Sequence, residues 1–136
     1  MNGIEHWTRK GDVKLFLWQK RAAAATRGTI LFVHGSSMAS QPTFDLQVPG
    51  RPHSSAMEWF AERGFDCWTL DNEGYGRSDK SRPINFDIAN GADDIEAATA
   101  HIGKKVMMYG ISSGALKAAL FAQRHPERVA RLALDA

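Results

Sequence analysis

Apolar residues occur along the chain in two alternating patterns. Short apolar runs that suit β-strands occupy residues 13–19, 29–35, 65–71, 105–109 and 131–136. Apolar residues at helical spacing occupy 55–64, 89–102 and 113–124, the last of these with apolar positions at 116, 120 and 121. The run at 29–35, T-I-L-F-V-H-G, is nearly continuous. This is typical of a strand that is buried on both faces of a parallel sheet.

The order of these elements predicts the fold class. Strands that alternate with helices indicate an α/β protein with a mostly parallel sheet, right-handed crossovers and helices on both faces. The 136 residues suffice for one small domain with a core, and no composition shift marks a boundary. We therefore expect residues 1–136 to belong to a single domain.

Composition and charge exclude several classes of partner. The net charge of +2, from 17 basic and 15 acidic residues, gives no sign of nucleic-acid binding. No apolar run approaches the ~20 residues that span a bilayer, so we expect no membrane partner. The N-terminus lacks a signal-peptide pattern, and Cys67 is the only cysteine. These features predict a cytoplasmic protein.

The segment G-I-S-S-G at residues 110–114 lies between a predicted strand and a predicted helix. Glycines permit close approach at such a junction, so Ser112 is expected at the exposed carboxyl end of the strand. The amide of Ser113 then lies at a helix N-terminus, where its N–H points outward. A hydroxyl beside such a donor suits acyl transfer. The alternative is an ordinary strand–helix turn with a capping serine.

Two further segments follow predicted strands. In H-G-S-S at 34–37, Gly35 allows a sharp turn, and the amide of Ser36 is a second candidate oxyanion donor; we interpret His34 as structural. In D-N-E-G-Y-G-R-S-D at 71–79, Asp71 and Ser78 are expected to tie a glycine-rich loop by local hydrogen bonds. A phosphate cradle is the competing interpretation there, but the G-x-G-x-x-G spacing is absent.

Together with H-P-E-R-V at 125–129, these segments resemble the α/β-hydrolase family in order and separation. The resemblance implies that Ser112 is the nucleophile and that the amides of Ser36 and Ser113 form the oxyanion hole. A serine at the elbow argues against the haloalkane-dehalogenase branch. Esterases, lipases, carbon–carbon hydrolases and peptidases stay open. The implied reaction is hydrolysis of a small-molecule ester or other activated carbonyl through an acyl-enzyme, with no metal or organic cofactor.

The chain departs from the family in length, since members are usually about twice as long. They carry a lid, further strands, and a triad acid and histidine after the nucleophile. Here His125 lies a helix length from Ser112, and Asp135 is interpreted as a strand-end aspartate. We therefore expect the acid and histidine beyond residue 136, with the fold truncated after about the sixth strand and this portion alone inactive.

That expectation leaves alternatives for function and for partners. A non-catalytic binding protein of the same fold and an inactive fragment are the alternative functions. Partners expected for a truncated sheet are the missing C-terminal portion as another chain, or a second copy of this chain.

The long segment at 36–54 is the candidate specificity element. Met38, Phe44 and Leu46 are expected to wall an apolar substrate pocket beside Ser112. The alternative is a solvent-facing loop with a few apolar residues packed beneath it.

Overall fold

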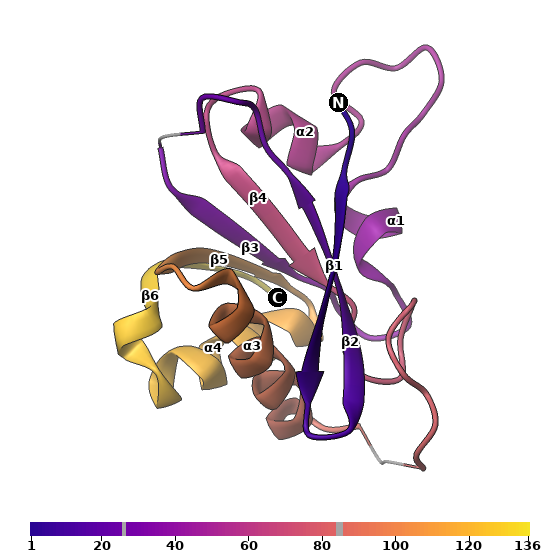
Figure 1. Cartoon of the computed structure of the whole chain (residues 1–136), viewed down its shortest axis with the longest axis vertical. Coiled ribbons are helices and arrows are strands. Elements are labelled where there is room, and N and C mark those ends of the chain that lie inside the picture. Colours follow the sequence, from indigo (N-terminus) through magenta and orange to yellow (C-terminus); the bar gives the residue numbers. More distant parts are fainter. Residues whose placement is uncertain (26, 84–85) are drawn as a thin grey trace.

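The computed structural model describes residues 1–25, 27–83 and 86–136. In these ranges one sheet has the strand order β1-β2-β4-β3-β5-β6 (Figure 1). The strands are β1 Ile4–Lys10, β2 Val13–Lys20, β3 Thr29–Val33, β4 Asp66–Leu70, β5 Val106–Ile111 and β6 Val129–Asp135. The strands β4, β3, β5 and β6 pair in parallel, whereas β1 and β2 are antiparallel to their neighbours. The predicted α/β class with a mostly parallel sheet is confirmed.

Helices cover both faces of the sheet. They are α1 Ser40–Phe44, α2 Ala56–Ala61, α3 Ile88–Ile102, α4 Ser113–Arg124 and the 3₁₀ turn η1 Pro126–Arg128. Figure 1 shows α3 and α4 together on one side of the sheet and α1 and α2 on the other. The helix α1 was not predicted, because residues 36–54 were expected to lack regular structure.

Alternation along β3 produces this two-sided burial. Leu31 and Val33 pack in the core cluster that includes α3 and α4, whereas Ile30 and Phe32 pack in the cluster with α1 and α2. All five residues of β3 are buried, as its continuous apolar sequence predicts. The central strand is thereby held from both sides, and its carboxyl end carries the H-G-S-S turn.

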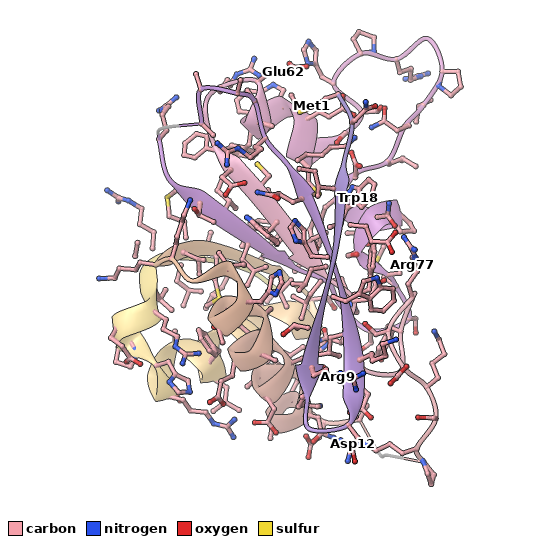
Figure 2. The ribbon with its side chains drawn as sticks, in the orientation of Figure 1. Met1, Arg9, Asp12, Trp18, Glu62 and Arg77 are labelled. Carbon is pink, nitrogen blue, oxygen red and sulfur yellow. The ribbon has the colours of Figure 1, made fainter. Side chains whose placement is uncertain are left out.

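The first strand, β1, was not predicted from the sequence. It pairs with β2 along its whole length, around a turn in which Gly11 has a φ of +58°. Figure 2 shows Arg9 and Asp12 at this turn, at the opposite end of the molecule from Met1 and Glu62. The hairpin thus runs along the length of the molecule. Within the described ranges, the helices fall short of the length and apolar character needed to cross a membrane.

Candidate active site

Ser112 occupies the junction between β5 and α4 in an unusual backbone conformation. Its φ of +56° and ψ of −128° lie outside the regions that residues with a Cβ prefer. Ser112 is exposed to solvent. A Cβ on Gly110 would lie 2.4 Å from the carbonyl oxygen of Gly114, and a Cβ on Gly114 would lie 2.3 Å from that of Val33. Both glycines are therefore required by close backbone approach, as the sequence predicts.

The turn after β3 lies directly beside this junction. A Cβ on Gly35 would lie 3.0 Å from the Cβ of Ser112 and 3.5 Å from its Oγ. The next residue, Ser36, has its hydroxyl 2.9 Å from the hydroxyl of Ser113. Because Ser113 is the first residue of α4, its N–H has no acceptor within the helix. The structure thus brings together the three residues that the sequence assigned to nucleophile and oxyanion hole.

His34 supports this turn from below. Its side chain is fully buried, and its Nε2 accepts a hydrogen bond of 3.0 Å from the backbone N–H of Asn72. The other ring nitrogen, Nδ1, therefore carries the proton and donates to the carbonyl oxygen of Gly35 at 2.7 Å. Because Nε2 accepts a hydrogen bond, the ring is neutral, and burial, the largest cause, lowers the pKa of His34 in the same sense. The structural interpretation of His34 is confirmed.

Asp71 organises the glycine-rich loop after β4. Its carboxylate accepts hydrogen bonds from the backbone N–H of Arg77 at 2.9 Å and of Ser40 at 2.8 Å. Ser78 donates to the carbonyl oxygen of Asp71 and accepts from the backbone N–H of Phe16. A Cβ on Gly76 would lie 2.3 Å from the Asp71 carboxylate, so no side chain fits there. The predicted structural role of Asp71 and Ser78 is confirmed.

Lys117 is a buried amine that sequence analysis missed. Only 2% of this residue is exposed, and its Nζ donates to Asn72 Oδ1 at 3.3 Å. The same Nζ lies 5.5 Å from the ring centroid of Tyr75 and 5.2 Å from that of Phe86. Burial lowers the pKa of Lys117 to about 8. The apolar pattern of this helix does not reveal Lys117, since Leu116, one of its apolar positions, is 58% exposed and Lys117 is buried instead.

A network of buried charges lies beside Lys117. The carboxylate of Asp94 accepts from Asn72 Nδ2 at 3.0 Å and from the backbone N–H of Glu73 at 2.9 Å. Lys10 bridges Asp94 at 2.6 Å and Glu73 at 2.9 Å, and Arg82 binds both oxygens of Glu73. Arg82 and then Lys10 lower the pKa of Glu73 to about 2, whereas burial raises that of Asp94. This network holds the 71–79 loop beneath the candidate site.

The three residues expected to wall one pocket lie in different places. Met38 is exposed and lines a groove of about 440 Å³ together with Tyr75 and Gly74. Phe44 is buried and lines a second, apolar groove of about 900 Å³ across β3, β5 and β6. Leu46 is 49% exposed and belongs to the lining of neither groove. The structure therefore does not bring them together: Met38 precedes α1, Phe44 is its last residue and Leu46 follows it.

All five histidines of the chain lie in the described ranges, and each lies in a part of the structure other than the Ser112 turn. His34 is buried as described above, and His6 and His101 contact each other at 3.3 Å. His125 ends α4, where it contacts Glu127, and His53 lines a surface cavity beside Glu58. A general base for Ser112 is therefore not supplied by any histidine in residues 1–136 in this arrangement.

Asp135 has settled hydrogen-bond partners near the site, whereas Cys67 lies near the start of β4, away from Ser112. The carboxylate of Asp135 accepts a 2.5 Å hydrogen bond from the hydroxyl of Tyr109, and its backbone carbonyl accepts 2.7 Å from the N–H of Ser112. The hydrogen bond to Asp135 raises the pKa of Tyr109. Cys67 is buried, and burial raises its thiol pKa to about 12, so it is no competing nucleophile.

Comparison with known proteins agrees with this architecture. Residues 28–136 match the model of the alpha/beta hydrolase fold family. The match covers most of the chain, so the protein belongs to this family. Among curated proteins, none is similar enough in sequence to count as a relative.

Several solved structures share the fold. A membrane phospholipase A described as a bacterial virulence factor is 24% identical with a TM-score of 0.76, and the match covers 97% of this chain and 39% of that one. An epoxide hydrolase from Vigna radiata is 18% identical with a TM-score of 0.77, covering 96% and 38%. An esterase from Exiguobacterium antarcticum is 21% identical with a TM-score of 0.76, covering 95% and 44%. The chain thus spans about two fifths of their length.

Proposed function

We propose that the protein is a serine hydrolase of the alpha/beta hydrolase fold, acting on an ester or other activated carbonyl. The observation that carries this proposal is the exposed, positive-φ Ser112 beside Gly35, with Ser36 and Ser113 in mutual contact. A hydroxyl held in this way next to a helix N-terminus is suited to attack a carbonyl carbon.

The proposed reaction has two stages. The Oγ of Ser112 attacks the carbonyl while its proton passes to a histidine, and the N–H groups of Ser36 and Ser113 stabilise the oxyanion. The alcohol or amine then leaves with that proton, and water hydrolyses the acyl-enzyme. The histidine and its partner acid are proposed to lie beyond residue 136, because each of the five histidines described above lies in another part of the structure.

Labelling with a fluorophosphonate probe tests this proposal. The full-length gene product should be labelled covalently, and Ser112→Ala should remove the label. Ser81→Ala, at an exposed serine outside the site, is the matched control and should be labelled like the wild type. Equal labelling of Ser112→Ala and wild type would overturn the assignment.

A second candidate function is ligand binding without catalysis. It is favoured by the placement of the histidines, since no hydrogen bond from a histidine to Ser112 is found within the described residues. A folded full-length protein that neither reacts with the probe nor hydrolyses p-nitrophenyl esters would support this candidate. Turnover that depends on Ser112 would exclude it.

A further inference from the structure

The strand β1 and the helix α3 are joined by three contacts from one face of the strand. Lys10 bridges Asp94 at 2.6 Å, Thr8 Oγ1 donates to the carbonyl oxygen of Ala97 at 3.5 Å, and His6 meets His101 at 3.3 Å. Alternate strand residues thus meet successive turns of the helix. The histidine pair lies at the C-terminal end of α3. The contacts of Lys10 and Thr8 hold β1 against earlier turns of the same helix.

The hydrogen bonds of Gln19 fix which ring nitrogen of His6 donates and which one accepts. The carboxylate of Asp66 accepts from Gln19 Nε2 at 2.7 Å and from Trp68 Nε1 at 3.0 Å. Since the amide nitrogen of Gln19 is engaged, its Oε1 faces His6 Nε2 at 2.9 Å and accepts the proton of that nitrogen. His6 Nδ1 is therefore an acceptor, and in the metal-free protein it accepts the proton of His101 Nε2 at 3.3 Å, the position that a metal ion would take.

This arrangement meets the requirements of a metal-binding histidine. A ligating ring usually donates its other N–H to an anchored oxygen, and the Asp66–Gln19 pair supplies that anchor for His6. His6 also packs on Trp68, with ring centroids 4.5 Å apart, which limits rotation of the imidazole.

The distance between the two rings also fits chelation. The nitrogens His6 Nδ1 and His101 Nε2 are 3.3 Å apart. Two imidazole nitrogens at ~2.1 Å from one ion, with an angle of roughly 105° between the bonds, are about 3.3 Å apart. The pair can therefore bind one ion once the His101 ring turns its Nε2 lone pair towards that ion and carries its proton on Nδ1.

We propose that His6 and His101 form a binding site for a divalent transition-metal ion, with Cu²⁺ bound more tightly than Zn²⁺ or Ni²⁺. In the part of the chain that the structure describes, no group of three histidine, cysteine or acidic side chains is placed to hold a metal. The protein thus supplies two ligands, and water completes the coordination. The bound ion links residues 95 positions apart in the chain, so it stabilises the docking of β1 on α3.

Titration calorimetry with CuCl₂ and with ZnCl₂, on protein without an affinity tag, tests the proposal. We expect one ion per chain, and a loss of affinity of at least tenfold in His6→Gln and in His101→Gln. Gln19→Leu, which removes only the anchor of His6, should weaken binding by about tenfold. His125→Gln is the matched control and should bind like the wild type, as should Ser112→Ala.

A spectroscopic measurement separates ligation from a loss of folding. Electron paramagnetic resonance of the Cu²⁺ complex should show coupling to two nitrogens in the wild type and fewer in His101→Gln, whose position is exposed. Circular dichroism melts should show that each variant is folded. Wild-type affinity in either His6→Gln or His101→Gln would overturn the proposal. So would a wild-type protein that takes up no metal, because the two rings would then be joined only by a hydrogen bond.

Discussion

The hydroxyls of Ser36 and Ser113 lie 2.9 Å apart and join two turns that are 77 residues apart in the chain. This hydrogen bond fixes the spacing of the two amides proposed to stabilise the oxyanion. Such a bond contributes about 0.5–1.5 kcal/mol, so Ser36→Ala and Ser113→Ala should each slow fluorophosphonate labelling of Ser112 by roughly 2–10-fold. The rate constants of labelling, measured on the full-length protein, check this.

A double variant decides whether the two hydroxyls act as a unit. Because either single change breaks the same bond, Ser36→Ala combined with Ser113→Ala should be no slower than the slower single variant. If the two effects multiply instead, the serines act independently and the bond has no role in positioning the amides.

The positive φ of Ser112 predicts a conflict between stability and reactivity. A residue with a Cβ in this conformation costs about 1–3 kcal/mol, and glycine avoids most of that cost. Ser112→Gly should therefore be about 1 kcal/mol more stable than Ser112→Ala, by urea unfolding, although both lack the nucleophile. At Ser113, the first residue of α4, the backbone is helical and glycine has no such advantage, so Ser113→Gly should be no more stable than Ser113→Ala. The same order at both positions would contradict the argument from strain.

Lys117 should make the protein less stable at neutral pH than at high pH. Its pKa is about 8 when folded and ~10.4 when unfolded, so the unfolded chain binds more protons between these values. The free energy of unfolding should rise as the pH increases from 8 to 10.5. Lys117→Met should remove this rise and stabilise the protein at pH 7 by about 2 kcal/mol. Lys105→Met, at an exposed lysine, should change neither property.

Unfolding by urea at several pH values measures both effects of Lys117. The difference between wild type and Lys117→Met isolates the amine from other groups that titrate in the same range. A variant that is less stable than the wild type at pH 7 would show that the bond to Asn72 outweighs the cost of burying the charge.

Glu73 should contribute stability that disappears in acid. Its pKa is about 2 when folded and ~4.3 when unfolded, so the stabilisation is complete above the unfolded value and is lost as the pH falls towards 2. Glu73→Gln should cost about 1–3 kcal/mol at pH 7 and much less near pH 2. Glu5→Gln is the control, because the Glu5–Arg77 pair is exposed and such pairs contribute little.

Chemical unfolding at pH 7 and at pH 2.5 checks the role of Glu73. Asp94, whose pKa is raised by burial, titrates in the opposite sense and shares Lys10 with Glu73. The wild-type curve therefore contains both contributions, and the difference from Glu73→Gln separates them. An equal cost at both pH values would mean that Glu73 is held by packing and not by its charge.

Sequence alone predicted the parallel part of the sheet because its strands are apolar runs closed by glycine or acidic residues. It also predicted the junction at Ser112, because the glycines at 110 and 114 mark a tight strand–helix turn, although the contact that requires Gly114 comes from the distant Val33. The edge strand β1 was missed because it is mostly exposed and I-E-H-W-T-R-K shows no regular alternation of apolar residues. The Gly-Asp pair at 11–12, between two extended runs, was the available signal.

Contacts between segments that are distant in the chain could not be predicted from the sequence. The burial of Lys117 depends on Asn72 and on the close approach of Gly91, whose Cβ position would lie 2.5 Å from the lysine side chain. Likewise, the meeting of Ser36 with Ser113 depends on the pairing of β3 with β5. Each relationship requires a three-dimensional register that local patterns do not specify.

The contacts of Gly35, Gly110 and Gly114 have a consequence for engineering. The main chain around position 112 is shaped by these neighbours and not by the serine itself. A different reactive group installed there, such as a cysteine thiol or an aspartate carboxylate, would inherit the same location and the same adjacent amides. The reacting atom at position 112 can therefore be exchanged by substitution while the surrounding backbone stays unchanged.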